Sequence, residues 1–402
     1  MTAFADVQPP ARDAAFTLPN VWLFGLVERF VRFLHPNEVL CTLRCVDKAT
    51  AEQFRGRPEF ATVRLSQPVP PLAFAARWAA PGAMRELSLD QRKQLLRLTA
   101  ASGVAANLDV ALEAVGFVPD SGELKDFYLA ASAAGHADVV HCLMQRHLID
   151  ASVLSDAMGI AAAAGHGTVC EVLFSSNSST QWKTEHVTSA LRGGHPELAD
   201  WLLQRRPEGA IGPGDSLAPL GAYKCSQLLQ AAAESCDLPT LRSLHQRCGH
   251  VGVAIPAAVL GSAAGSRTAD WQAKVEWAES QLPPDFRPST GVCAAAVPCS
   301  DAELRLAWLL ARGYPATAYV VDRALECGCV AALELLLRRG LQPGRGAVEN
   351  AARQGRLEAL KKLHEHGCPL NAATVALAAG WSGHSAVRAW AVEELGAPED
   401  PY

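Results

Sequence analysis

Four histidines stand directly after a glycine, at equivalent points of a recurring sequence pattern. They are His136, His166, His195 and His384. Histidine is the side chain best suited to proton transfer near neutral pH, and it is the commonest metal ligand. Catalytic groups have to converge on one point, whereas a repeat of about 30 residues carries each histidine one repeat away from the next. We therefore predict that these side chains hydrogen-bond the backbone of turns.

The cysteines are the other candidates for chemistry. There are twelve, and none forms a C-x-x-C pair. The nearest approach to a metal motif is His364-x-His366-x-Cys368, in which alternate residues of a helix would point to different sides. The sequence also lacks the H-E-x-x-H, G-x-x-x-x-G-K-S/T, G-x-G-x-x-G and G-x-S-x-G motifs. We expect no catalytic residues, no metal, no cofactor and no enzyme activity.

Composition narrows the class of protein. The chain has 402 residues, of which 49% are apolar and 19% charged, so most of it should pack a core. A formal charge of −5 leaves no basic surplus for nucleic acid. No apolar run reaches the roughly 18 residues of a membrane span, and no signal peptide is evident. We expect a monomer in the cytoplasm or nucleus, with reduced and mostly buried cysteines.

One pattern runs through three quarters of the chain. Residues 324–343 and 351–370 both read alanine, three residues, glycine, then leucine or valine two, five and eight residues later. We call the glycine position the anchor. It recurs ten times, at Gly103, Gly135, Gly165, Gly194, Cys236, Gly265, Cys299, Gly328, Gly355 and Gly383. The residue four positions before the anchor is alanine in eight of these ten places, which chance would not produce.

The pattern predicts a pair of helices in each repeat. Apolar residues three apart lie on one face of a helix, and the anchor permits a tight turn between the two helices. Neither helix can bury its apolar face alone, so consecutive pairs must stack. We therefore expect an all-α protein in which about ten helix pairs form an α-solenoid.

The repeat resembles the ankyrin repeat. The matching segments are ASAAGH (131–136), AAAAGH (161–166), RGGH (192–195) and WSGH (381–384), each followed by a leucine-rich helix. The Thr-Pro-Leu-His opening of that family is missing, and most repeats are shorter than about 33 residues. The resemblance implies an ankyrin-like solenoid that binds another protein. The stretches 205–224 and 279–292 are rich in glycine or proline and should be surface loops between repeats.

The N-terminal region predicts a second, smaller module. Apolar residues at helical spacing run from Leu23 to Leu34, and Pro36 should end that helix. Asn37 and Glu38 should open the next helix as its cap, and a third should follow near Phe54. A helix in 71–80 and a capping box formed by Ser88 and Gln91 then lead into the first repeat.

Residues 21–54 resemble an F-box. The matching features are an apolar first helix, a Leu-x-Pro step at Leu34 to Pro36, a second amphipathic helix, and Val46 to Lys48. The resemblance implies docking on the Skp-type adaptor of a cullin-type ubiquitin-protein ligase. The adaptor-binding residues that it implies are Leu23, Leu26, Pro36, Val39 and Leu40.

Two interpretations of the whole chain remain open. In the first, the chain is the substrate receptor of such a ligase, and its repeats bind a target whose identity the sequence does not give. In the second, it is a scaffold or sequestering protein, and its N-terminus only covers the first repeat at Leu95, Leu98 and Leu108. Trp182 and Trp381 have polar neighbours and are candidates for target contacts.

The predicted organisation has four parts. Residues 1–17 form a disordered tail, and 18–57 form the F-box-like module. Residues 58–87 form a linker that carries a short helix, and 88–397 form the repeat solenoid.

Overall fold

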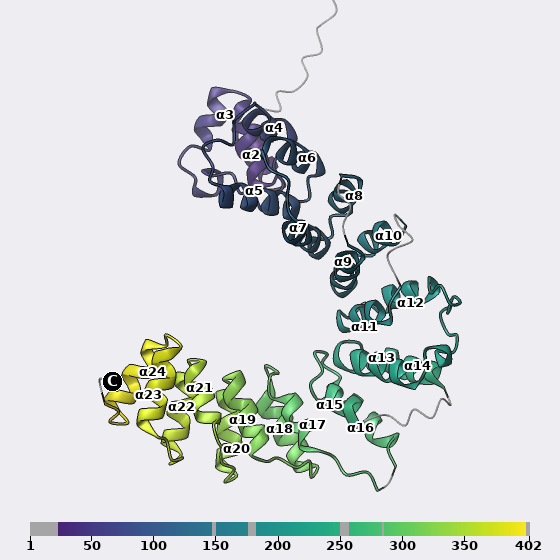
Figure 1. The fold of residues 1–402 in the computed structure, drawn as a ribbon, viewed down its shortest axis with the longest axis vertical. Helices are drawn as coiled ribbons and strands as arrows, with labels where there is room; N and C mark the ends of the chain where they lie inside the picture. The colour runs from purple at the N-terminus through teal and green to yellow at the C-terminus, as the bar shows by residue number, and fades with distance from the viewer. Residues whose placement is uncertain (1–22, 147–149, 176–181, 250–256, 284, 399–402) are drawn as a thin grey trace, which may run out of the picture. The chain divides into compact units, whose positions relative to one another are not determined.

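The computed structural model describes residues 23–146, 150–175, 182–249, 257–283 and 285–398. Within these ranges the chain forms helices and no strand (Figure 1). The all-helical class predicted from the sequence is therefore confirmed. The chain divides into two compact units, with the boundary between residues 149 and 150. The tail predicted at 1–17 lies outside the described residues.

The first unit contains a small helical module, a further short helix and two helix pairs. The module comprises α1 (Phe24–Val31), α2 (Pro36–Cys41), the 3-10 helix η1 (Leu43–Cys45), α3 (Lys48–Gln53) and η2 (Pro58–Phe60). After it come α4 (Pro71–Trp78), the pair α5 (Leu89–Ser102) and α6 (Ala105–Ala114), and the pair α7 (Ser121–Ala134) and α8 (Ala137–Arg146). The predicted capping box is present at the start of α5, because Ser88 and Gln91 each accept a backbone N–H from the other.

The module has a hydrophobic core of its own. Its buried members are Val27, Val31, Val39, Leu43, Phe54 and Phe60. The rings of Phe54 and Phe60 meet edge to face, with their centroids 5.5 Å apart. Arg57 donates to Glu28 at 2.8 Å and ties the end of the module back to α1. These six residues, all between positions 27 and 60, form one hydrophobic cluster.

The turn between α1 and α2 differs from the prediction. Helix α1 ends at Val31, and Pro36 is the first residue of α2 instead of the last of α1. The cap is His35, because its ring accepts the N–H of Asn37 and its own N–H is donated to Glu38. Proline suits the first turn of a helix because its missing N–H would have no partner there. The expected cap at Asn37 and Glu38 was therefore wrong by two residues.

Residues 58–87 are packed, although the sequence suggested a linker. Asn37 is fully buried, donates to the carbonyls of Arg64 (2.9 Å) and Pro68 (3.0 Å), and accepts the N–H of Arg64. Further along, the carbonyl of Val69 accepts from Asn107 of α6 at 2.8 Å, and α4 packs against α6. The apolar side chains that this stretch buries are Phe60, Val69, Phe74 and Met84. The covering of the first helix pair thus comes from 68–84.

The second unit consists of eight helix pairs within the described residues. The first four are α9 (Ala151–Ala163) with α10 (Gly167–Ser175), α11 (Thr184–Arg192) with α12 (Pro196–Gln204), α13 (Ala222–Ser235) with α14 (Leu238–Cys248), and α15 (Ala257–Ala264) with α16 (Trp271–Ser280). The last four are α17 (Thr290–Ala296) with α18 (Ala302–Ala311), α19 (Ala318–Cys327) with α20 (Val330–Arg338), α21 (Ala347–Arg353) with α22 (Leu357–Glu365), and α23 (Ala372–Trp381) with α24 (Ser385–Glu393). A further 3-10 helix, η3 (Ala218–Leu220), precedes α13.

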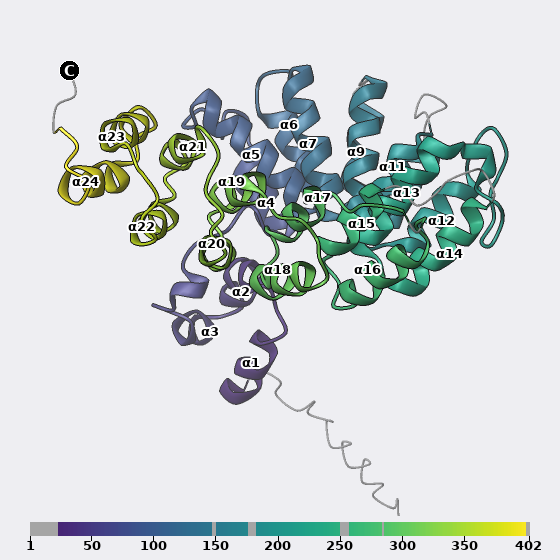
Figure 2. The same cartoon turned by 90° about the horizontal axis from the view of Figure 1, so that it is seen from below.

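Consecutive pairs of the second unit pack through their first helices. Helix α9 contacts α11, α11 contacts α13, and the series continues to α21 with α23. Figure 2 shows α17, α19, α21 and α23 on one side of the row and α18, α20, α22 and α24 on the other. The alanines four positions before the anchors are almost fully buried at Ala161, Ala190, Ala232, Ala324, Ala351 and Ala379. A small side chain at this position lets neighbouring helices approach closely.

The anchors lie in the turns between the two helices of each pair. Seven of the ten are glycines with φ between +68° and +83°, a region that other residues avoid. Cys236 has φ −102° and ψ 167°, which is extended backbone open to any residue. The sequence pattern therefore located every turn, but it did not show that the turns have more than one geometry.

The stretch 205–224 is held against the end of α14. Arg247 is 7% exposed and donates to the carbonyls of Gly212 (3.1 Å) and Asp215 (3.0 Å). In return, the N–H of Leu217 donates to the carbonyl of Arg247 at 2.7 Å. The apolar side chains buried in this stretch are Ile211, Leu217 and Leu220. The stretch lies between two helix pairs and most of its residues are exposed, as predicted, but the prediction weighed glycine and proline and overlooked these three apolar residues, which are buried.

Candidate functional site

Three of the histidines that follow the anchors, His136, His195 and His384, pack onto the preceding helix pair. His136 Nε2 lies 3.0 Å from the carbonyl oxygen of Ala101, near the end of α5. The ring of His384 covers Gly355 so closely that a Cβ there would lie 2.6 Å from its Nδ1 atom. The last carbonyls of a helix have no partner within it, so a donor from the next repeat stabilises the turn. The predicted bond to turn backbone is confirmed for His136.

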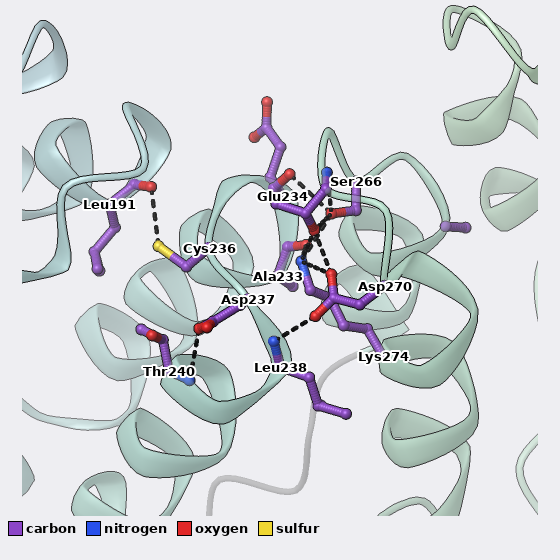
Figure 3. A network of polar contacts seen from close by, with 12 residues as sticks. Leu191, Ala233, Glu234, Cys236, Asp237, Leu238, Thr240, Ser266, Asp270 and Lys274 are labelled. Atoms are coloured by element: carbon purple, nitrogen blue, oxygen red, sulfur yellow. Dashed lines mark hydrogen bonds and ion pairs between the residues drawn. The ribbon is translucent and has the colours of Figure 1, made fainter.

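A buried lysine has this capping role where the anchor is Cys236 (Figure 3). Lys274 of α16 is fully buried, and its Nζ donates to the carbonyl of Ala233 at 3.2 Å. It also donates to Ser266 Oγ (2.8 Å) and Thr268 Oγ1 (2.6 Å). Burial lowers the pKa of Lys274, and the carboxylate of Asp270, 3.5 Å away, opposes that shift. The cation stands at the negative end of α13, where the helix dipole favours it.

Arg305 repeats this arrangement one pair further along. It is 5% exposed and donates at 2.8 Å to the carbonyl of Ala264, the last residue of α15, and at 2.8 Å to that of Ser266 in the turn after it. Its Nε atom donates to Asp301 at 2.6 Å. Because these buried cations are surrounded by backbone and hydroxyl acceptors, we assign them to holding consecutive pairs together.

One buried pair has the composition of a nucleophile and a base. Ser155 Oγ of α9 lies 3.1 Å from His186 Nε2 of α11. Burial lowers the pKa of His186 to about 4, so its ring is neutral near pH 7. His186 is only 3% exposed and Ser155 only 8%, so a substrate has no access to them. The pair links two first helices, and the sequence analysis did not single it out.

The cysteines are placed as packing residues. All twelve are free thiols. Seven are buried: Cys142, Cys170, Cys225, Cys236, Cys248, Cys293 and Cys368. Burial raises the pKa of the Cys170 thiol to about 12, which keeps it protonated and unreactive. Cys45 is the one exposed cysteine among the twelve.

No metal site is formed in the part of the chain that the structure describes: no group of three or more His, Cys, Asp or Glu residues could hold an ion there. In the 364–368 stretch, the ring of His364 packs edge to face against Trp390, with 6.2 Å between their centroids. Cys368 is buried. None of the described helices is long and apolar enough to cross a membrane.

The exposed apolar side of α1 is the feature that best fits a functional surface. Val27 and Val31 point into the module's core, but other apolar residues in α1 and next to its ends do not. Leu23 is 56% exposed, Phe30 is 45% and Phe33 is 88%. Leu26, which is half-buried, and Phe30 lie one turn apart on α1, Leu23 immediately precedes the helix, and Phe33 lies in the turn two residues after it. We call these four residues the exposed apolar flank of α1. The apolar arc of α1 is therefore wider than the core beneath it.

The predicted adaptor-binding residues divide into two groups. Leu23 lies on the exposed flank of α1, and Leu26, Pro36 and Leu40 are half-buried. Val39 is 0% exposed and belongs to the module's core, so it is unavailable to a partner. The prediction was wrong for Val39, because helical spacing marks an apolar face without showing how much of it the module covers.

An apolar groove lies beside the module within the first unit. Its volume is about 600 Å³. Leu34, Leu43 and Val46 line it from the module, and residues 68–71 and Val104 line it from the packed stretch and the first helix pair. Sequence analysis missed this groove and also Phe33. The available signal for Phe33 was a third phenylalanine continuing the apolar flank past the end of α1.

The two tryptophans proposed for target binding are placed differently. Trp182 is half-buried, and its indole N–H donates to the carbonyl of Leu202 at 2.7 Å. That bond fixes Trp182 to the end of α12. Trp381, at the end of α23, is 77% exposed and remains a candidate contact residue.

Comparison of the sequence with models of known protein families gives no match, and comparison with curated proteins gives none either. The functional argument therefore rests on the residues and their geometry.

Proposed function

We propose that this protein is a non-enzymatic recognition subunit: its N-terminal module docks on a Skp-type adaptor of a cullin-type ubiquitin-protein ligase, and its helix pairs hold the target protein. The proposal joins the F-box-like and ankyrin-like sequence patterns to the packing of the chain. Ubiquitin transfer itself belongs to the partners.

The exposed apolar flank of α1 carries the proposal. Phe33 is 88% exposed, and an aromatic side chain in water does not stabilise the fold. Contiguous apolar surface on a soluble domain marks an interaction site. The first helix pair does not need the flank as a cover, because residues 68–84, which include α4, already pack against that pair. A helical partner that packs on the flank would bury it, in the way that amphipathic helices are commonly recognised.

The repeat region supports the target-binding half. We propose that its helix pairs form an ankyrin-like α-solenoid, in which first helix packs on first helix from α9 to α23. Stacked pairs present a long surface whose exposed side chains differ from repeat to repeat, which suits protein recognition.

The test mixes the purified full chain with an excess of a purified Skp-type adaptor and separates the mixture by size-exclusion chromatography. We expect a complex with the wild-type chain and none when Phe30→Asp and Phe33→Asp are combined. Val118→Asp is the matched control, because Val118 is 85% exposed in the same unit but lies outside the module. Circular dichroism should show the same helix content in all three proteins. A wild-type chain that stays monomeric beside excess adaptor would refute the ligase role.

A scaffold or sequestering role with no link to ubiquitin is the second candidate. It is favoured by the bonds from Asn37 and Asn107 to residues 64–69, which give the N-terminal region a structural purpose of its own. This candidate predicts the monomer in the same experiment.

A further inference from the structure

A groove opens between the second helices of two neighbouring repeats, α12 and α14. Its volume is about 330 Å³. Its apolar lining comes from three helices and consists of Val187, Leu191, Ala199, Leu203, Leu244 and two prolines. One end is bounded by Arg247, which also holds the stretch 209–217 in place. Pro196 and Pro239, the prolines in the first turns of α12 and α14, line it as well.

The lining of the groove contains more carboxylates than cations. Glu197 and Asp200 of α12 line it, and Arg247 is the only cation in its lining. Asp200 Oδ1 accepts from Arg247 Nη1 at 2.7 Å, so these two charges offset each other. Glu197 is exposed one turn nearer the start of α12. It leaves the groove with a net negative charge.

An anionic occupant is disfavoured by the way Arg247 is used. Its Nε and Nη2 atoms donate to the carbonyls of Asp215 and Gly212, and Nη1 donates to Asp200. Arg247 is only 7% exposed, and the donors of its guanidinium are occupied by acceptors within the protein. A cationic side chain with an apolar stem fits instead, because its stem can lie on half-buried Pro196 and exposed Pro239 while its charge reaches the carboxylates.

We propose that this groove binds a lysine or arginine side chain in a basic segment of a target protein. The proposal deepens the target-binding half of the proposed function and rests on it. Charge complementarity selects the occupant, and Pro196 and Pro239 supply contact area for its methylene chain.

The experiment uses three pentapeptide amides, acetyl-Gly-Leu-X-Leu-Gly, in which X is lysine, norleucine or glutamate. They are titrated to about 5 mM into full-length protein with labelled methyl groups, and the NMR signals of Leu203 and Leu244 are followed. We expect the lysine peptide to shift both signals and to bind about three- to fivefold more tightly than the norleucine peptide, the upper part of the range for a solvent-accessible ion pair. The glutamate peptide should bind more weakly than either.

Two variants locate the effect. Glu197→Lys should weaken the lysine peptide by at least the same factor, because it replaces the uncompensated carboxylate. Glu303→Lys is the matched control: Glu303 is exposed at the second position of α18, as Glu197 is in α12, and the change of charge is identical. Ser243→Trp, on an exposed lining residue, should block the groove and abolish the shifts.

Equal binding of lysine and norleucine peptides would overturn the proposal, as would the absence of shifts or an equal loss with Glu303→Lys. Failure here is distinguishable from failure of the ligase role. Without methyl shifts but with an adaptor complex, only the groove proposal falls. With lysine-selective shifts but no adaptor complex, only the ligase role falls.

Discussion

The contact between an anchor glycine and the ring of the next repeat can be tested directly with Gly355→Ala. Gly355 has φ +70°, and an added Cβ would lie 2.6 Å from Nδ1 and 2.9 Å from Cε1 of His384. Two costs follow. An alanine in the left-handed region costs about 1–2 kcal/mol. Displacing a packed ring costs about 1–3 kcal/mol more.

Gly383→Ala separates these two costs. Gly383 is the anchor of the last pair, has φ +77°, and has nothing within 4 Å of its added Cβ. Its variant should therefore lose only the backbone term, about 1–2 kcal/mol. Gly355→Ala should lose about 2–5 kcal/mol in all. The free energies come from urea unfolding followed by circular dichroism, with hydrogen exchange over 347–393 as a local reading that does not assume a single transition.

A double-mutant cycle with His384→Ala tests the assignment to the ring. Once the ring is removed, Gly355→Ala should cost no more than Gly383→Ala, so the coupling energy should be about 1–3 kcal/mol. The reasoning would be refuted if Gly355→Ala and Gly383→Ala were equally destabilising, or if the cost of Gly355→Ala were the same with and without His384.

Three further outcomes are expected. Lys274→Met should lower the free energy of unfolding by about 2–4 kcal/mol, because the buried carbonyl of Ala233 loses its hydrogen-bond donor. In the same urea assay, the control Lys361→Met, at an exposed ion pair, should change that free energy by less than about 1 kcal/mol. His186 has a pKa of about 4 in the folded protein, below its unfolded value of about 6.5. Its contribution to stability, about 3 kcal/mol, is therefore fully present above pH 6.5 and is lost as the pH falls through 4. His186→Gln should make the urea midpoint depend less on pH between about 6.5 and 4, and an unchanged pH profile would contradict the lowered pKa of His186. Rapid alkylation with N-ethylmaleimide should modify Cys45 first and the seven buried thiols only on unfolding, and mass spectrometry showing stoichiometric disulfides would overturn the picture of free cysteines.

The sequence by itself determined the helices and their pairing. Each of the ten predicted anchors lies between two helices, and six of the seven alanines four positions earlier in the second unit are buried, Ala295 being half-buried. Such features are local: helical periodicity, a small residue at a helix crossing and a glycine at a left-handed turn are all visible within about 20 residues of sequence. The capping box at Ser88 was predictable for the same reason.

Tertiary structure decided how much of each apolar face is covered. Val39 and Phe33 both look like face residues in the sequence, yet Val39 is fully buried and Phe33 is 88% exposed. The buried roles of Lys274 and Arg247 depend on carbonyl groups more than 30 residues away in the chain. A single sequence marks the period of a helix, but burial and capping across repeats depend on which distant segments fold against it, and only the packed structure fixes those partners.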